Sequence, residues 1–396
     1  MSASVMSRRI GLSEPVLEGN EGKYLLECVE SGWISSAGPF VTRFEEEIAR
    51  RLEAKHAVAT ASGTAALHLA LIACGVSAND EVILPSVTFI APANAVRYVG
   101  AHPVFVDVDR ATLQLDVEAV REFLETETVP SVEGVINRRT GRPVRAILPV
   151  HLLGHPVDMD ALLELAKRFG LRVIEDASEA MGARYRGRSV GALGDVGCMS
   201  FNGNKTITCG GGGMFLTDDG GMAALARHLS TQARVSGEEF IHDRVGYNYR
   251  LTNLQAAVGL AQVEALERFL AAKVRIQQFY REELAVLPGV EMVESASWAE
   301  SSYWLSAIRL SRGEGGVGPR DVRRSLSEQQ IETRPLWQPL HLSPAMQPAQ
   351  GFPACPQAEA AYEECLCLPS TPSLSDGDLE RVASAIRSAL RNSQRS

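Results

Sequence analysis

The chain has 396 residues and a formal net charge of −9, and 45% of its residues are hydrophobic against 22% charged. This length exceeds that of one ordinary domain, and the composition is typical of a globular protein with a large core. The acidic balance excludes a general nucleic-acid-binding surface, which needs clustered Lys and Arg, but it is compatible with a local pocket for one phosphate.

The sequence also indicates the cellular compartment in which we expect the protein. No apolar run approaches the roughly 18 residues of a membrane-spanning helix, and the start, MSASVMSRRI, lacks the apolar stretch of a signal peptide. The seven cysteines are an odd, scattered set that suits a reducing compartment. We therefore expect a cytoplasmic protein that has neither a membrane nor a nucleic acid as partner.

In chain order, the first predicted element is a helix that begins with a capping box, Thr42-Arg43-Phe44-Glu45, after a Gly/Ser/Pro-rich loop. From there to about residue 217, short apolar runs alternate with helical stretches. This alternation predicts an α/β fold with a largely parallel sheet wrapped by helices. The predicted strands are His56–Ala59, Glu81–Leu84, Pro103–Val108, Arg145–Val150, Leu171–Glu175, Val196–Phe201 and Gly213–Leu216, and predicted helices follow Gly63 and Pro92 and span Asp158–Phe169.

The pattern changes after Thr252. The run LQAAVGLAQVEALERFLAAKVRIQQFYREEL predicts one long helix of the kind that links domains. Beyond it come a strand-like YWLSAIRL, a helix opened by Pro319, a strand-like IETRPLW and a final helix near 378–390. We expect a large domain over 1–270, with an N-terminal arm, and a smaller C-terminal α+β domain over 271–396.

Three stretches contain residues that could bind a cofactor or take part in a reaction. In SFNGNKTITCGGGGM, Lys205 follows a strand and precedes four glycines, a loop whose backbone can approach a ligand and whose lysine can form a Schiff base with a carbonyl. In VIEDASEAMG, Asp176 stands at the carboxyl end of a buried strand, where a carboxylate can pair with the pyridinium nitrogen of pyridoxal phosphate. Ser62-Gly63-Thr64 opens a helix and can bind one phosphate. Taken singly, each has a plain alternative: an exposed loop lysine, a capping acid and an ordinary N-cap.

Together these residues resemble the DegT/DnrJ/EryC1/StrS family of sugar aminotransferases over about residues 10–390. SFNGNKTITCGGGGM, LSTQAR, IHDRVGYNYRLTNLQAAVGLAQ and RPLWQPLH with CLPS resemble its legionaminic-acid-pathway branch in particular. The resemblance implies the fold-type-I architecture of pyridoxal-phosphate enzymes and a homodimer with shared active sites.

The resemblance also implies roles for residues. Lys205 matches the lysine that holds the cofactor and shuttles protons, and Asp176 matches the partner of the pyridine nitrogen. Gly63, Thr64 and Ser200 fall where the family binds the cofactor phosphate. Lys205 speaks against a sugar 3-dehydratase, which has histidine at this position.

Further positions follow from the same resemblance. Phe89 lies where an aromatic ring stacks on the cofactor, and Asn248 matches an asparagine that reaches the phosphate from the other subunit, with Arg250 beside it as a substrate contact. Glu179 stands where most of the family has glutamine near the cofactor's phenolic oxygen. Glutamate there adds negative charge or is protonated.

The expected reaction moves an amino group from L-glutamate to C4 of a nucleotide-linked 4-keto-6-deoxy sugar. The branch resembled implies UDP-2-acetamido-2,6-dideoxy-hexos-4-ulose; a dTDP- or GDP-linked 4-keto sugar, or a non-catalytic regulatory role, are the alternatives. Arg334, Trp337 and His341, with Arg250, could grip a diphosphate and stack on a base, although a core Trp337 and a surface Arg334 would look the same in sequence.

No metal site is expected. Asp107-Val108-Asp109 suits two acids that end a strand better than a metal-nucleotide site. Glycine and proline beside His151 and His155 disfavour a metal-binding helix, and Cys365 with Cys367 lacks a second pair.

Overall fold

The computed structural model describes residues 8–132, 134–235, 239–293, 295–310, 317–348, 350–352 and 354–392. Its largest feature is a ten-stranded sheet. The strands of this sheet are β1 His56–Thr60, β2 Glu81–Pro85, β3 His102–Val106, β4 Thr128–Ser131, β5 Gly134–Asn137, β6 Pro143–Ile147, β7 Arg172–Asp176, β10 Val196–Ser200, β11 Gly213–Thr217 and β16 Gln350–Phe352. Their order is β1-β11-β10-β7-β6-β2-β3-β16, with β5 beside β6 and β4 beside β5. From β10 to β16 along this order, neighbouring strands are parallel.

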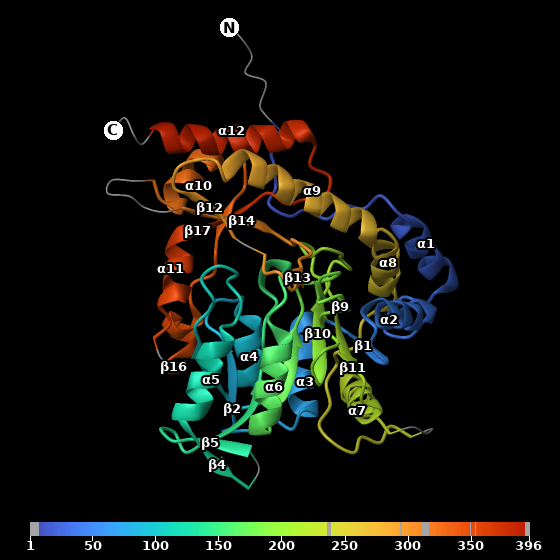
Figure 1. Cartoon of the computed structure of the whole chain (residues 1–396). Helices are drawn as coiled ribbons and strands as arrows, with labels where there is room; N and C mark the ends of the chain where they lie inside the picture. The colour runs from blue at the N-terminus through green and yellow to red at the C-terminus, as the bar shows by residue number, and fades with distance from the viewer. Residues whose placement is uncertain are drawn as a thin grey trace.

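Helices cover both faces of this sheet (Figure 1). They are α3 Gly63–Ala73, α4 Ala91–Tyr98, α5 Val117–Thr126, α6 Met159–Phe169 and α7 Gly220–Ser230. Helices α1 Glu21–Ser31, α2 Pro39–Leu52 and α8 Asn253–Glu264 pack together beside β1. Successive residues of a strand point to opposite faces, so Val173 joins the core beneath α5 and α6 while Ile174 joins the core beneath α3 and α4. The predicted fold is confirmed, and each strand predicted between residues 56 and 217 is present with its ends shifted by a few residues.

A second sheet of four antiparallel strands lies beside the first. It contains β12 Val290–Met292, β14 Ser306–Leu310, β15 Arg334–Pro335 and β17 Cys365–Leu368, in the order β12-β14-β17-β15. Its core is shared with α9 Leu266–Leu284, α10 Pro319–Glu328 and α12 Asp376–Asn392 (Figure 1). The remaining elements are α11 Pro356–Glu364, the three-stranded sheet of β8 Arg184–Tyr185, β9 Arg188–Ser189 and β13 Ala299–Glu300, and short 3₁₀ turns at Leu152–Gly154, Leu340–Leu342 and Pro344–Met346.

The division into domains after residue 270 stays a prediction. The four-stranded sheet draws all its strands from residues 290–368, but β16 from the same part of the chain pairs with β3 in the large sheet. The N-terminal segment joins the small sheet's side of the molecule, because Ile10 N donates to Gln330 O and Glu332 N donates to Ile10 O, both at 2.9 Å.

Two helix boundaries differ from the predictions. The first predicted helix is α2, and it begins at Pro39 rather than at the capping box of Thr42, because the Asn253 side chain accepts from Phe40 N at 2.9 Å and caps the helix from a distant part of the chain; α1 precedes it in a stretch where the sequence predicts no helix. Gly38 (φ 145°) permits this approach, since a Cβ there would lie 2.4 Å from Asn253 Cγ. The predicted long helix is in fact two, α8 and α9, which end and begin around Ala265 (ψ −2°) and pack into different cores.

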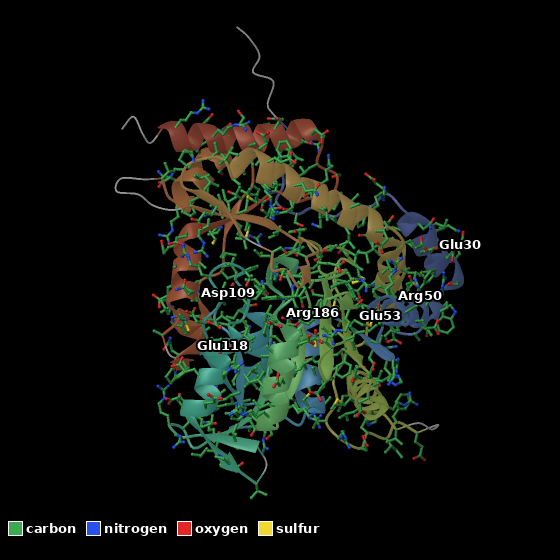
Figure 2. The ribbon with its side chains drawn as sticks, viewed as in Figure 1. Glu30, Arg50, Glu53, Asp109, Glu118 and Arg186 are labelled. Carbon is green, nitrogen blue, oxygen red and sulfur yellow. The ribbon has the colours of Figure 1, made fainter. Side chains whose placement is uncertain are left out.

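The charges lie mainly outside these cores. The charged residues labelled in Figure 2, among them Arg50, Glu118 and Arg186, are exposed. In the part of the chain that the structure describes, no helix is both long enough and apolar enough to span a membrane.

Lys273 in α9 is an exception and gives a prediction of pH dependence. It is 1% exposed, its ammonium donates to the carbonyls of Trp304 (2.9 Å) and Ser370 (3.0 Å), and burial lowers its pKa to about 7. Unfolding therefore takes up a proton between pH 7 and about 10.4, so the free energy of unfolding rises with pH in this window. Lys273→Met should remove about 3 kcal/mol of that rise between pH 7 and 9.5.

Urea unfolding of the wild type, Lys273→Met and the exposed control Lys167→Met at both pH values measures this difference. Parallel pH profiles for the wild type and Lys273→Met would mean that the buried lysine keeps its proton throughout.

Candidate active site

The carboxyl ends of several parallel strands meet at one pocket, the position at which open α/β sheets bind ligands. The pocket encloses about 260 Å³ between the start of α3, the ends of β7 and β10, the loop after β10 and the segments around Trp304 and Trp337. It brings together most of the site residues predicted from the sequence. These are Gly63, Thr64, Phe89, Asp176, Glu179, Ser200, Lys205, Arg334 and Trp337.

Asp176 is the last residue of β7 and lies inside the sheet, between β6 and β10. Its backbone N–H donates to Pro149 O and its carbonyl accepts from His151 N, so the strand holds its position. The carboxylate is 4% exposed and accepts from Ser178 N at 3.0 Å. Burial raises the pKa of Asp176, so a cationic donor placed against this carboxylate would relieve the cost of desolvation.

A second buried acid stabilises the same strand end. Glu175 is fully buried, bonds to His151 Nε2 at 3.0 Å and accepts from the amides of Gly191, Leu193 and Gly194 at 2.6–2.8 Å. Val157 N donates to His151 Nδ1, so His151 Nε2 carries the proton toward Glu175. Burial would raise the pKa of Glu175, but the bonds from His151 and these amides hold it below its ordinary value. Both ring nitrogens of His151 therefore bond to the protein, and the ring holds the end of β7 in place.

Lys205 enters the pocket from the loop after β10. Its Nζ lies 4.0 Å from the centre of the Trp304 ring and 3.3 Å from Glu179 Oε1. Trp304 Nε1 donates to Asn204 O at 2.7 Å, which ties the indole to the residue before the lysine. Trp304 and Trp337 stack at 6.3 Å between ring centres. An aromatic wall thus covers the amine and shields it from water.

Glu179 places a second buried carboxyl group in the pocket. It is 5% exposed, and its Oε2 accepts from Leu153 N at 2.8 Å. Burial raises the pKa of Glu179, and the nearby ammonium of Lys205 opposes that rise. Asp176 and Glu179 together place two buried carboxyls beside one ammonium, so the pocket suits a ligand that brings a positive charge of its own.

The start of α3 forms the anion-binding end of the pocket. Ser62 caps the helix by accepting from Ala65 N at 3.1 Å, and Gly63 and Thr64 supply the amides that precede this bond. A Cβ on Gly63 would lie 2.8 Å from Ser200 Cβ, so only glycine allows the helix start and the end of β10 to approach so closely. A phosphate placed there would meet the helix dipole and the Ser200 hydroxyl.

Three predicted site residues do not line the pocket of their own chain. Asn248 is exposed. Arg250 Nη1 lies 2.5 Å from Glu45 Oε1 and also donates to Ala59 O, so it joins α2 to β1. His341 Nδ1 bonds to Ser86 Oγ at 2.6 Å and its Nε2 bonds to Glu359 Oε1 at 3.2 Å, so the ring joins the segment after β2 to α11.

Trp304 is the site residue that sequence reasoning missed. Trp304 belongs to the strand-like run YWLSAIRL. Nothing in this run indicates that the indole ring extends from the small sheet to Lys205. The acids of Asp107-Val108-Asp109 have structural partners: Asp107 accepts from the amides of Gln357 and Ala358 at the start of α11, and the exposed Asp109 (labelled in Figure 2) accepts from Thr112 N.

Comparison with known proteins identifies the class. Residues 15–387 match the DegT/DnrJ/EryC1/StrS aminotransferase family, so the chain belongs to this family. It is 43% identical over 384 residues to the GDP-perosamine synthase of Caulobacter vibrioides, covering 96% of this chain and 98% of the relative. A Bacillus subtilis relative, EpsN, 37% identical with 95% of each chain covered, is named as a pyridoxal phosphate-dependent aminotransferase. The crystal structure of the aminotransferase TlmJ from Streptoalloteichus hindustanus superposes with a TM-score of 0.87 at 32% identity, covering 97% of this chain and 99% of that one.

The protein is thus a pyridoxal-phosphate-dependent aminotransferase of this family. The pocket fits this cofactor, because it offers an anion-binding helix start at one end, a buried carboxylate in need of a cationic partner at the other and a lysine beside them. The relatives do not confirm the legionaminic-acid branch expected from the sequence motifs.

Proposed function

We propose that the protein transfers an amino group from L-glutamate to C4 of a GDP-linked 4-keto-6-deoxy sugar. The observation that carries the aminotransferase chemistry is the placement of Lys205, Asp176 and the start of α3 around one pocket. The GDP-linked acceptor is supported by the near full-length relative whose name gives a GDP-linked product. It replaces the UDP-linked acceptor expected from the sequence, which rested on the motifs of the legionaminic-acid branch.

In this proposal each residue has a defined task. Gly63, Thr64 and Ser200 hold the cofactor phosphate, and Asp176 holds the proton on the pyridine nitrogen. Pyridoxal phosphate, when bound, supplies the electron sink that stabilises a carbanion at the reacting carbon. The Lys205 amine takes the proton from Cα of the amino donor and delivers it to C4′ of the cofactor.

The other pocket residues orient and shield these groups. Glu179 hydrogen-bonds the Lys205 amine, Phe89 flanks the cofactor ring, and Trp304 limits the access of water to Lys205. Arg334 and Trp337, at the mouth, are proposed to receive the diphosphate of the nucleotide-linked keto sugar, which is the amino acceptor.

Competition among acceptors tests the substrate. With glutamate as donor and equal concentrations of GDP-, UDP- and dTDP-linked 4-keto-6-deoxy sugars, we expect the GDP sugar to be aminated in preference by about tenfold or more. Product masses in the mixture measure the preference. Dominant amination of the UDP or dTDP sugar would overturn the GDP assignment and leave the aminotransferase class intact.

We also propose that the active unit is a homodimer with shared sites. Apolar side chains are exposed on the segment after α1 (Trp33 and Ile34) and on the segment that precedes Asn248 (Phe240, Ile241 and Val245). Both segments lie on the side of the molecule that carries α1, α2 and α7 (Figure 1). Burial of these apolar side chains against a second copy would remove them from water and would bring Asn248, which lies outside its own pocket, to the partner.

A mixed dimer tests this arrangement. We expect Lys205→Ala and Asn248→Ala chains, each impaired alone, to regain activity when combined, because one of the two sites in the mixed dimer then collects both defects and the other neither. Recovery approaching one wild-type site per mixed dimer is expected in steady-state assays. Absence of recovery, with subunit exchange verified by differently tagged chains, would contradict a shared site.

A further inference from the structure

A second groove continues from the mouth of the candidate active site. It encloses about 320 Å³ and is lined by the N-terminal segment from Arg9 to Pro15, by Gly203 and Asn204, by Trp304 and Leu305, and by Glu332 and Arg334. Asn204, Trp304 and Arg334 also line the active-site pocket, so the two cavities share a wall. We call this cavity the N-terminal groove.

Hydrogen bonds hold one wall of the N-terminal groove in place. Ser13 Oγ donates to Asn204 O at 2.9 Å, the same carbonyl that accepts from Trp304 Nε1. Leu12 O accepts from Ser370 N at 2.7 Å, and Ile10 pairs with the backbone around Ile331. The segment that forms one side is therefore fixed to the residue preceding Lys205 and to the small sheet's side of the molecule.

Two arginines and two glutamates line the N-terminal groove. Arg9 Nη2 lies 2.8 Å from Glu332 Oε2, and the side chains are 64% exposed for Arg9 and 39% exposed for Glu332. Glu14 is the other groove carboxylate, 3.8 Å from Arg9 Nη1. Arg334, two residues after Glu332 and at the wall shared with the active site, is exposed, and no hydrogen bond or ion pair of its guanidinium occurs among the described residues.

We propose that the N-terminal groove is the nucleoside subsite and that the Arg9–Glu332 pair reads the guanine base, an inference that rests on the proposed GDP-linked substrate. With the keto sugar at Lys205, the diphosphate passes Arg334 and the base reaches the groove. Guanine presents the acceptors N7 and O6 next to the donors N1–H and N2–H₂. An arginine can donate to the first pair and a carboxylate can accept from the second, and the side-by-side arrangement of Arg9 and Glu332 matches that sequence of acceptors and donors.

The same pair disfavours pyrimidine nucleotides. Uracil and thymine present a single N3–H between two carbonyl oxygens. A carboxylate that accepts from N3–H would face both carbonyl oxygens, so it gains one hydrogen bond and suffers repulsion from its flanks. Glu332 thus selects guanine by what it accepts and rejects uracil and thymine by its charge.

Binding of free nucleotides to the cofactor-loaded enzyme tests the inference. Calorimetry with GDP, UDP, dTDP and inosine diphosphate, which lacks the N2 amino group, is carried out on the wild type and Glu332→Gln. We expect the wild type to prefer GDP over each of the other three, and Glu332→Gln to weaken GDP by about 10- to 100-fold and to bind GDP and inosine diphosphate alike. Glu328→Gln, which changes an exposed acid of α10 outside the groove lining, is the matched control and should change GDP affinity by less than about threefold.

Two outcomes separate this inference from the proposed function. A wild-type preference for UDP or dTDP overturns the GDP-linked substrate itself. A wild-type preference for GDP that Glu332→Gln leaves unchanged, or that Glu328→Gln reduces as much as Glu332→Gln does, overturns the Glu332 assignment alone. Arg334→Ala should weaken all four nucleotides by a similar factor, because it contacts the diphosphate that they share.

Discussion

Lys205→Ala should reduce transamination by about 10⁴-fold or more, because the change removes both the amine that binds the cofactor and the general base that moves the proton. No other amine in the described pocket lining can take its place, since Lys205 is the one lysine among those residues. Steady-state turnover with glutamate and the preferred keto sugar measures the loss.

The control for this variant is Lys167→Ala, which removes an exposed lysine of α6 and should leave turnover unchanged. Ammonia or methylamine should restore part of the activity of Lys205→Ala, since an external amine can replace the missing base. Turnover of Lys205→Ala near that of the wild type would show that the proton is moved by another group.

Asp176→Asn should lower turnover by about 10²- to 10³-fold, because asparagine cannot supply the negative charge that keeps the proton on the pyridine nitrogen. The fold should survive: asparagine has nearly the same shape, and its side-chain oxygen can still accept from Ser178 N. Removing a buried carboxylate whose pKa is raised by burial also relieves a desolvation cost. The melting temperature of the apoprotein should therefore match or exceed that of the wild type.

Asp109→Asn provides the matched control, because Asp109 is an exposed acid in the loop after β3 with only a local turn to stabilise. A variant Asp176→Asn with normal turnover would make this carboxylate structural. A variant that fails to fold would show that the carboxylate, rather than its shape, holds β7 in the sheet.

The sequence predicted the centre of the fold because its signals are local there. Short apolar runs that end in Asp176 or Ser200 identify parallel strands, and the carboxyl ends of such strands meet at one edge of the sheet. Lys205 and Gly63 adjoin those ends directly. Their convergence on one pocket therefore follows from the common direction of the strands that precede them.

Features that depend on distant contacts could not be predicted in this way. The start of α2 is set by Asn253, and the division between α8 and α9 by the different cores against which they pack. Trp304 reaches Lys205 only because the small sheet is folded over the large one. Arg250 was expected to contact the substrate, but in the fold its guanidinium lies 2.5 Å from Glu45 Oε1.

The nucleotide was the least predictable feature. Motifs near Lys205 and around RPLWQPLH report the shared chemistry of the family, and they do not reveal which base is bound. The Arg9–Glu332 pair involves residues more than 300 positions apart, joined only when Ile10 pairs beside Ile331. A base-reading site of this kind becomes visible in the folded chain and not in any single stretch of sequence.

Reduction of the cofactor-loaded enzyme with sodium borohydride, followed by peptide mapping, tests the central assignment most directly. Borohydride converts a C=N bond between a lysine amine and the cofactor aldehyde into a stable secondary amine. We predict that the yellow colour is bleached and that the pyridoxyl group is found on the peptide that contains Lys205, with none on Lys167 or Lys273. A pyridoxyl group on another lysine, or no covalent adduct at all, would contradict the site described here.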